Sequence, residues 1–413
     1  MRIMVVCPYL PYPPDSGSLL RTYHIVTRLA LRHSVHLLCF THGVQESIFS
    51  GQGVKERRFG LADGVAEVQV VAGPGHDRTD PLSVRLQRLI NSTPVWVAHN
   101  YWPAMRDAFM EMVRRTKPDV IQFETAWSAG HLWSLAEEDV VKVVNLHNVE
   151  HDLMRQQLEQ NPPGEMLERL RQTRQWLIVR GWEARMLRRA DLVLAPSAED
   201  LSLLRVLYRG LRGLVVPNGV VVGGFEEGKG GPGSQIVFTG TLCYPPNEDG
   251  VLWFIRDILP LVEERVPNVR FVIVGREPTS ALMAAHDGQR VVVTGRVPEV
   301  APYLRNADVA VAPLRAGSGT RIKVLEAMAA GRAVVSTQVG SQGLKVVDGE
   351  EIRLADEPRA FADAVSGLLG NADERRRLAR QGRRLVKRLY DWDVIVAGLE
   401  GSYGQLVTHR AGS

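Results

Sequence analysis

Two segments of this chain are near duplicates of each other. Residues 191–196 read DLVLAP and residues 308–313 read DVAVAP, and each is preceded by an alanine and an arginine-containing helix end. Short apolar runs of this kind are typical of strands that are buried on both faces of a parallel sheet. Their repetition therefore predicts two similar α/β units, each with a doubly wound, Rossmann-like parallel sheet.

The length of 413 residues is sufficient for two domains, each with its own hydrophobic core. We place the hinge at VVPNGV (215–220) and at the glycine-rich loop 223–233, because glycine, proline and asparagine mark turns. The sequence thus predicts a first domain over 1–200, completed by a C-terminal helix over 392–413, and a second domain over 210–390. We expect the two domains to face each other across a cleft.

The second predicted domain contains an informative stretch, residues 291–337. Its pattern predicts, in this order along the chain, a strand, a short helix, a second strand, a glycine-rich turn, a second helix and a third strand. The turn is AGSG (316–319). The helix is predicted to begin at Thr320 and to end at Gly331, since glycine is common just after a helix. Three apolar residues at helical spacing are expected to form its buried face: Ile322, Leu325 and Ala329.

Two cations lie in the first turn of this predicted helix, where the macrodipole is positive. Arg321 and Lys323 therefore cost local stability unless an anion binds beside them. A helix N-terminus, two cations and a glycine turn together favour a phosphate group. Glu326, one turn further along, could accept hydrogen bonds from sugar hydroxyls. The pattern predicts a nucleoside-diphosphate site, although Lys323 and Glu326 could instead be an i,i+3 surface pair.

The first predicted domain offers two candidate positions for ligand binding. Gly17 and Ser18 begin a helix after a proline-rich loop and could face a ligand, although a stiff connection capped by a serine explains them equally well. His147 ends the strand predicted over 142–147, at the carboxyl edge where the ligand sites of α/β proteins gather. A histidine at a strand end can also be structural, so both interpretations stay open.

Composition limits the classes of partner. The formal net charge is +4 and the pI is about 9.0, which mildly favours anionic ligands or an anionic membrane surface and does not indicate nucleic-acid binding. Residues 165–190 form an arginine-rich helical stretch that could make a peripheral membrane contact, with a solvated basic face as the simpler alternative. The cysteines are scattered and no apolar run approaches 18 residues, so we expect a cytoplasmic protein, with any membrane contact at the inner face.

Several catalytic motifs are absent from the sequence. The segment GSGTRI (317–322) has only two of the three glycines of a dinucleotide-binding fingerprint, and no Walker A sequence occurs. Asp391 and Asp393 resemble the metal-binding DxD of some sugar transferases, but they lie between the terminal helices and far from any strand end. No cluster of His, Cys and acidic residues has metal-ligand spacing. We therefore predict no metal site and no cofactor.

Together these motifs resemble glycosyltransferase family 4, which comprises retaining enzymes with the two-domain GT-B fold. The resemblance covers nearly the whole chain. It includes the glycine turn followed by LEAMAAGRAVVST, the strand end LHN, VPNGV at the hinge and FTGTL at the start of the second domain. The segment YPPNED (244–249), with Trp253 and Phe254, is similar to a subgroup associated with bacterial exopolysaccharide assembly.

The resemblance implies a role for each matching residue. Glu326 would bind the ribose of the nucleotide, and the backbone around Gly319, Thr320 and Arg321 would bind its diphosphate. His147 would lie near the transferred sugar. In the first domain, Gly17 would close the cleft, and Ser18 is predicted with it to bind the donor.

The chain departs from the family pattern at two positions. Ser318 stands where the family usually has a glutamate, eight residues before the ribose-binding one. Thr241 follows Gly240 at a place where the family usually has an arginine and then a lysine. Neutralisation of the phosphates is therefore expected from Arg321 and Lys323.

The function predicted from the resemblance is that of a metal-independent, retaining glycosyltransferase for hexosyl groups. It would move a sugar from a nucleoside-diphosphate sugar to a lipid-linked or oligosaccharide acceptor, in polysaccharide, glycolipid or natural-product glycosylation. The sequence offers no candidate nucleophile, so the family favours front-face attack by the acceptor. Two alternatives stay open: a nucleotide-sugar 2-epimerase with the same two-domain fold, and a non-enzymatic scaffold at a membrane surface.

Overall fold

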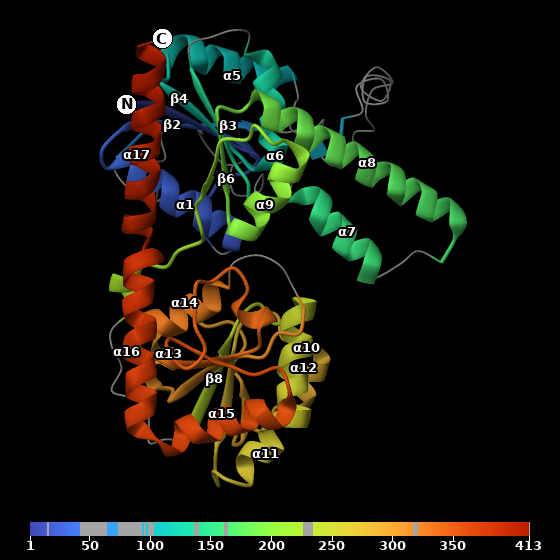
Figure 1. The fold of residues 1–413 in the computed structure, drawn as a ribbon, viewed down its shortest axis with the longest axis vertical. Coiled ribbons are helices and arrows are strands. Elements are labelled where there is room, and N and C mark those ends of the chain that lie inside the picture. Colours follow the sequence, from blue (N-terminus) through green and yellow to red (C-terminus); the bar gives the residue numbers. More distant parts are fainter. Residues whose placement is uncertain are drawn as a thin grey trace. The chain divides into compact units, whose positions relative to one another are not determined.

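The computed structural model has two compact units, each built around one parallel β-sheet (Figure 1). The first unit comprises Met1–Val216 and Val396–Ser413, and the second comprises Pro217–Ile395. The predicted fold class, two doubly wound α/β units, is confirmed by these sheets. The structure describes residues 1–14, 16–41, 64–72, 93–94, 96–97, 103–135, 140–160, 164–225, 234–316 and 321–412.

The first sheet has seven strands in the order β3-β2-β1-β4-β5-β6-β7, and its neighbouring strands are parallel. The chain moves outward from β1 to β3 and then places β4 on the other side of β1. The topological switch point, where α/β proteins bind ligands, therefore lies between β1 and β4. The strands are β1 Arg2–Cys7, β2 Ser34–Thr41, β3 Val65–Ala72, β4 Val120–Glu124, β5 Val141–Asn145, β6 Leu192–Ala195 and β7 Gly213–Val215.

Helices connect the strands of the first unit and cover its core. Phe109 of α5 and Phe123 of β4 are fully buried, with ring centroids 6.0 Å apart. The arginine-rich stretch predicted over 165–190 forms one helix, α8. The elements are α1 Gly17–Ala30, α5 Pro103–Thr116, α6 Thr125–Ser128, η2 Ala129–Ser134, α7 Glu150–Gln160, α8 Met166–Arg189, α9 Ala198–Leu207 and α17 Trp392–Ala411.

The first unit extends further along the chain than the sequence predicted. Strand β7 pairs in parallel with β6 and so belongs to the first sheet, whereas the predicted second domain began at 210. Backbone hydrogen bonds determine this boundary, because Val216 N continues the pairing by donating to Ala195 O at 2.8 Å. The second unit therefore begins at Pro217, within the predicted hinge.

The second sheet has six strands in the order β10-β9-β8-β11-β12-β13, again with parallel neighbours. Its switch point lies between β8 and β11, since the chain runs outward from β8 to β10 before placing β11 beside β8. The strands are β8 Gln235–Thr239, β9 Arg270–Val274, β10 Val291–Val293, β11 Val309–Ala312, β12 Ala333–Ser336 and β13 Arg353–Leu354. The helical elements are η3 Val222–Gly224, α10 Pro245–Trp253, η4 Phe254–Ile258, α11 Leu259–Glu263, α12 Ser280–Ala284, α13 Ala301–Asn306, α14 Ile322–Ala329, η5 Val339–Ser341, α15 Pro358–Gly370 and α16 Ala372–Leu389.

The duplicated segments occupy different places in the two sheets. DLVLAP contributes β6, well away from its switch point, whereas DVAVAP contributes β11, directly beside the other one. Their shared aspartate has the same local role in both places. Asp191 accepts a hydrogen bond from Lys142 N at 2.7 Å, at the start of the neighbouring strand β5. Asp308 accepts from Ser234 N and Gln235 N at 3.1 Å, at the start of β8. The repeat therefore reflects a common way of beginning a parallel strand rather than equivalent positions.

Helix α14 is shorter than predicted at its start. Arg321 is its N-cap rather than a first-turn residue, and its side chain is buried. Gly331 has a φ of 69° just beyond the helix, the left-handed conformation expected there. Ile322 is only half-buried and so lies at the margin of the predicted buried face. The buried residues are Val324, Leu325, Ala327, Met328 and Ala329.

The C-terminal helix α17 contributes to the first unit from Val396 onward. Val396, Leu399 and Tyr403 are fully buried, and Tyr403 Oη donates a hydrogen bond to Gln122 Oε1 of β4. Helix α17 thus packs against β4, a strand that lies about 280 residues before it in the sequence. Among the helices within the described residues, none is long and apolar enough to cross a membrane.

This packing predicts that α17 stabilises the first unit. Leu399→Ala should lower the free energy of unfolding by about 2–5 kcal/mol, because it leaves a cavity among fully buried neighbours. Val394→Ala on the same helix removes a side chain that is 47% exposed, so it should change stability by less than about 0.5 kcal/mol. Urea unfolding followed by circular dichroism measures both. Equal effects of the two substitutions would contradict the role of the helix in the core.

Candidate active site

The first candidate site lies at the switch point of the second sheet. Gly240 and Thr241 follow β8 directly, and α14 follows the neighbouring strand β11. Lys323 of α14 extends its ammonium group to Asn247 Oδ1, to which it donates a hydrogen bond. Asn247 is itself held in place, because its Nδ2 donates to Thr241 O at 2.7 Å. The structure therefore brings together Gly240, Thr241 and Lys323, three residues that are far apart in the sequence.

Gly240 lies in close contact with these groups, so a larger residue there would displace them by a few tenths of an ångström. A Cβ atom built there would lie 3.0 Å from Asn247 Nδ2 and 3.1 Å from Lys323 Nζ. The ammonium of Lys323 also lies 4.2 Å from the centroid of the Phe238 ring, within the range of a cation–π contact. Its partners are thus an amide and an aromatic ring, neither of which carries a negative charge.

Burial lowers the pKa of Lys323 to about 7, and the charge of Arg321 acts in the same direction. Burial also raises the pKa of Glu326 to about 7, against the opposing effect of Lys323. Within the described residues Lys323 pairs with Asn247 rather than forming the i,i+3 salt bridge with Glu326. The charged forms of both side chains are therefore poorly compensated by the protein. A charged or hydroxylated ligand that supplies the missing partner would gain binding free energy there.

The second predicted cation is differently placed. Arg321 is 6% exposed, and its Nε donates to Val339 O of η5 at 3.1 Å. Burial lowers its pKa. The expectation that Arg321 lies in the first helical turn is therefore wrong. It is the N-cap residue, its side chain makes no capping hydrogen bond, and its Nε has the Val339 carbonyl as an acceptor. Three predicted donor-binding residues lie outside the described residues: Ser318, Gly319 and Thr320.

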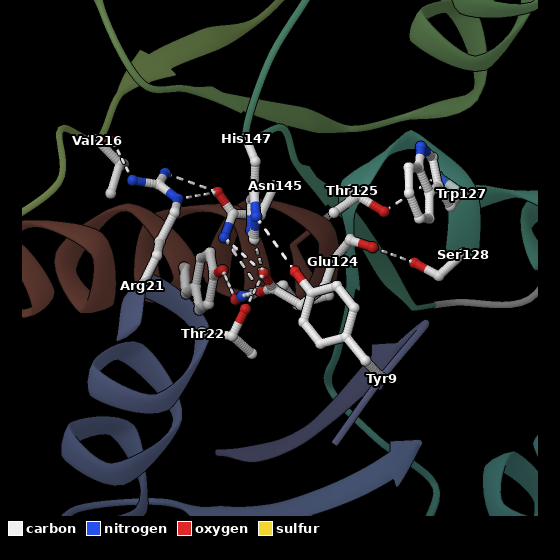
Figure 2. Close-up of polar contacts among 12 residues, drawn as sticks. Tyr9, Arg21, Thr22, Glu124, Thr125, Trp127, Ser128, Asn145, His147 and Val216 are labelled. Carbon is white, nitrogen blue, oxygen red and sulfur yellow. Dashed lines mark hydrogen bonds and ion pairs between the residues drawn. The ribbon is translucent and has the colours of Figure 1, made fainter. Parts of the chain in front are cut away.

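The second candidate site lies at the carboxyl edge of the first sheet (Figure 2). Tyr9 follows β1, Glu124 ends β4 and His147 follows β5. His147 Nε2 lies 2.8 Å from Glu124 Oε2, and His147 Nδ1 lies 3.3 Å from the Tyr9 hydroxyl. Both ring nitrogens of the predicted histidine thus have protein partners.

Glu124 is the centre of this network and is fully buried. Thr22 Oγ1 donates to it at 2.9 Å, and Asn145 Nδ2 lies 3.0 Å from both carboxylate oxygens. Gln122 Nε2 donates a further hydrogen bond. Arg21, also buried, donates to Asn145 Oδ1 at 2.7 Å, which fixes the orientation of that amide (Figure 2). The carboxylate is surrounded by donors, as a buried charge must be.

The charge state of the pair follows from these contacts. Burial acts to raise the pKa of Glu124, but hydrogen bonds from His147, Asn145 and Gln122 outweigh it and hold the pKa below its ordinary value. Burial lowers the pKa of His147, although Glu124 opposes this. At neutral pH Glu124 is therefore ionised and accepts from His147 Nε2–H. His147 Nδ1 is then the acceptor for the Tyr9 hydroxyl.

Helix α1 connects the predicted residues Gly17 and Ser18 to this network. They are its first two residues, and Ser16, the N-cap, makes no side-chain capping bond. Burial and the charge of Glu124 raise the pKa of Tyr9, whereas hydrogen bonds to Thr22 and Ser18 act to lower it. Ser18 therefore lies beside Tyr9, one turn before the helical residues that bind Glu124 and Asn145.

The sequence did not point to Tyr9, Glu124 or Asn247. Glu124 was the most accessible of these from pattern alone, because VIQFE is an apolar strand that ends in an acid directly at the carboxyl edge. Asn247 lies in the quoted segment YPPNED, but its contact with Lys323 joins residues 76 positions apart. Such contacts depend on the topology of the sheet and leave no local signal.

The acidic pair near the C-terminus has a structural role. Asp391 Oδ1 accepts from Asp393 N at 2.9 Å at the start of α17, and Asp391 Oδ2 accepts from Val222 N at 3.3 Å. Across the described ranges of the chain, no three His, Cys, Asp or Glu side chains are arranged to hold a metal ion.

Two family models match the chain in succession. The model described as Glycosyltransferase Family 4 matches residues 59–222, and the model described as Glycosyl transferases group 1 matches residues 233–371. The chain belongs to glycosyltransferase family 4. The first match falls mostly in the first unit, and the second match falls entirely in the second unit.

The curated relatives of this family 4 chain include phosphatidyl-myo-inositol mannosyltransferases. The protein from Mycobacterium tuberculosis is 33% identical over 207 residues, which cover 46% of this chain and 53% of the relative. The protein from Propionibacterium freudenreichii is 28% identical over 219 residues, which cover 51% of this chain and 55% of the relative. The chain thus spans about half the length of the curated relatives it matches.

Solved structures share the fold of this family 4 chain over almost its whole length. Sucrose-phosphate synthase from Thermosynechococcus elongatus has a TM-score of 0.71 at 16% identity, covering 99% of this chain and 100% of that one. Anabaena HepE in complex with UDP and glucose has a TM-score of 0.63 at 14% identity, covering 98% and 100%. These likenesses show the GT-B fold.

The Glu124 network predicts a large and pH-dependent contribution to stability. Glu124→Ala should lower the free energy of unfolding at pH 7 by about 3–5 kcal/mol, because it leaves several buried donors without an acceptor. The matched substitution of an exposed acid, Glu165→Ala, should have an effect below about 0.5 kcal/mol.

The pH dependence of this effect has a definite sign. The pKa of Glu124 is lower in the folded protein, so its stabilising effect is present above the unfolded value of 4.5 and is lost as the pH falls through the folded value. The difference between wild type and Glu124→Ala should therefore shrink below pH 4.5. Urea unfolding of both proteins at a series of pH values from 7 downward tests this. A difference in unfolding free energy that stays constant with pH would show that ionisation of Glu124 is unimportant for stability.

Proposed function

We propose that this chain is a retaining, metal-independent glycosyltransferase that moves a sugar from a nucleoside-diphosphate sugar to a hydroxyl group of an acceptor. The observation that carries the proposal is the ammonium of Lys323, which is held by the amide of Asn247 at the switch point of the second sheet. A carboxylate partner would neutralise this charge, whereas an amide positions it and leaves it available for an anion. Family membership supports the same activity.

In this proposal the second unit binds the donor. Lys323 and the N-terminus of α14 hold the diphosphate, with Gly319 and Thr320 contributing backbone N–H groups. Glu326 accepts hydrogen bonds from the ribose hydroxyls, which favour its ionised form. Gly240 and Thr241 lie against the phosphates, because Gly240 is in close contact with the Lys323 ammonium that binds them.

The chemical step exchanges one glycosidic bond for another. The bond between the anomeric carbon and the diphosphate oxygen breaks, and the acceptor hydroxyl oxygen bonds to the same face of that carbon. The acceptor proton passes to the departing phosphate oxygen. Negative charge grows on the diphosphate as it leaves, so Lys323 stabilises the transition state more than the bound donor.

On the first unit, the proposal assigns the network of Tyr9, Glu124 and His147 to the transferred sugar and the acceptor. Glu124 fixes the tautomer of His147, and the Tyr9 hydroxyl is the last group in this chain of hydrogen bonds. Gly17 and Ser18 at the start of α1 belong to the same edge. We take the donor sugar to be a hexose, because one relative is a phosphatidyl-myo-inositol mannosyltransferase and one structural neighbour holds UDP and glucose. The same relative favours a polyol headgroup or an oligosaccharide as the acceptor.

An assay of the donor with and without acceptor tests the proposed activity. A panel of nucleoside-diphosphate hexoses is incubated with the protein, alone and with a membrane-lipid extract or oligosaccharides. The proposal expects a glycosylated acceptor and release of nucleoside diphosphate, unaffected by a chelator. Conversion of the donor sugar without any acceptor would instead establish a 2-epimerase, and the absence of nucleotide binding would favour a scaffold.

Substitution of Lys323 tests its proposed role. Lys323→Met should weaken binding of nucleoside diphosphate by roughly 10- to 100-fold, since a charge-assisted contact contributes about 1.5–3 kcal/mol. The kcat should fall by more than the affinity, because the leaving-group charge grows in the transition state. The control Lys387→Met removes an exposed lysine of the same unit and should leave both unchanged. Normal affinity in Lys323→Met would refute the assignment.

The lowered pKa of Lys323 predicts that nucleotide binding is linked to proton uptake. Its pKa is about 7 without ligand, so the side chain is mostly neutral at pH 8. A bound diphosphate raises this pKa, so binding at pH 8 should take up about one proton and weaken as the pH rises above 7. Calorimetry in two buffers of different ionisation enthalpy measures the uptake. Glu326 is present in both proteins, so equal uptake in wild type and Lys323→Met would contradict the prediction.

A further inference from the structure

Helix α8 of the first unit is apolar on two opposite faces. One face packs into the core through Val179, Trp182 and Met186, which are all buried. The other face carries large apolar side chains that remain in solvent. Their exposed fractions are 77% for Met166, 60% for Leu170 and 55% for Leu177. A helix in a globular unit needs only one apolar face, so the second face requires an explanation.

Three of the four strongly exposed apolar residues of α8 form one stripe, and the fourth, Leu167, lies to one side of it. At ~100° per residue, Met166, Leu170 and Leu177 fall within about 40° of one another and extend over roughly 16 Å of the helix. This stripe points roughly 180° away from Val179 and Met186, on the far side of α8 from the core. Figure 1 shows α7 and α8 as a helical pair that projects from the sheet of the first unit. The stripe is therefore presented outward on a projecting element.

Arginine side chains flank the stripe. The helix (MLERLRQTRQWLIVRGWEARMLRR) contains seven arginines and only two glutamates. Glu183 is buried and accepts a hydrogen bond from His151 Nδ1 at 2.7 Å, so its carboxylate does not contribute to the exposed surface of α8. Glu168 lies 3.8 Å from Arg171. The two arginines nearest the stripe are both exposed: Arg174 and Arg180.

The acidic groups of the neighbouring helix α7 do not reverse this charge. Asp152 and Glu159 both pair with Arg155 of the same helix, at 2.8 and 2.7 Å. Glu150 faces Glu183 and the Trp127 side chain. The exposed side of the helical pair is thus apolar along its centre and mainly positive along its borders, with the exposed Glu165 at the N-terminal end of α8 as an acidic exception.

We propose that this stripe, Met166, Leu170 and Leu177 with Arg174 and Arg180 beside it, docks the protein on an anionic lipid bilayer. The apolar side chains enter the interface between headgroups and acyl chains, and the arginines contact lipid phosphates. A second copy of the chain fits less well, because two arginine-bordered surfaces would repel each other. The proposal concerns a different surface from the donor and acceptor residues and does not depend on the proposed function.

Vesicle sedimentation tests the proposal with the whole 413-residue chain. Wild type is mixed with phosphatidylcholine vesicles or with vesicles containing phosphatidylglycerol, at low and high salt. It should pellet with the anionic vesicles and bind them at least about tenfold more tightly than the neutral ones, with binding weakened by salt. No preference for anionic vesicles would overturn the proposal.

Two sets of variants locate the surface. Leu170→Glu with Leu177→Glu should reduce binding to anionic vesicles by about tenfold or more without lowering the melting temperature, because both side chains already face solvent. The matched control Val206→Glu changes an apolar residue of α9 that is 76% exposed, and it should bind like wild type. Arg174→Gln with Arg180→Gln should reduce binding and its salt dependence while keeping the apolar stripe.

Three results would overturn the assignment. The double leucine variant could bind as tightly as wild type, which would place the membrane contact elsewhere. Val206→Glu could lose binding equally, which would indicate a general charge effect. Sedimentation velocity could show a wild-type dimer that dissociates in the leucine variant, which would identify a second copy as the occupant of the stripe.

Discussion

The burial of one carboxylate is the constraint on which the first unit depends. A charge without access to water is stable only when donors surround it. The donors to Glu124 come from α1, from β5, from the loop after β5 and from its own strand: Thr22, Asn145, His147 and Gln122. Gln122 in turn accepts from Tyr403 of the C-terminal helix. Through these hydrogen bonds Glu124 couples the first sheet to two helices, α1 and α17, that lie far apart in the sequence.

The second unit applies the same principle with the opposite charge. A parallel sheet covered on both faces leaves only its strand ends for polar chemistry, and both networks lie at a strand end beside a switch point. In the first unit the acid is fully compensated by donors, so the network is rigid. In the second, Lys323 has a neutral amide and an aromatic ring as partners. On the basis of that difference, the proposed function assigns the first network to orienting a ligand and the second to binding an anion.

Local patterns were sufficient for the elements and for the kind of fold. Apolar strands, the helix signal before Gly331 and the strand-end position of His147 can all be found from short windows of sequence. Contacts between distant segments cannot be found in this way. The partner of Lys323 lies 76 residues away, and Arg321 is buried against a carbonyl 18 residues further on. Strand β7 was assigned to the wrong unit because its three residues are recognisable only by their pairing with β6. The sequence therefore predicted which residues carry charge at the sheet edges, but not which neighbours set their pKa values.

The place of α17 in the first unit has a consequence for how the chain is made. Ribosomes release a protein from its N-terminus, and domains commonly fold as they emerge. Here Leu399 and Tyr403, which fill the core of the first unit, are synthesised after the whole of the second unit. The N-terminal sheet must therefore wait, with Gln122 lacking its tyrosine partner, until residues beyond the second unit have been synthesised. The second unit, although later in the sequence, is the first that can reach its finished form.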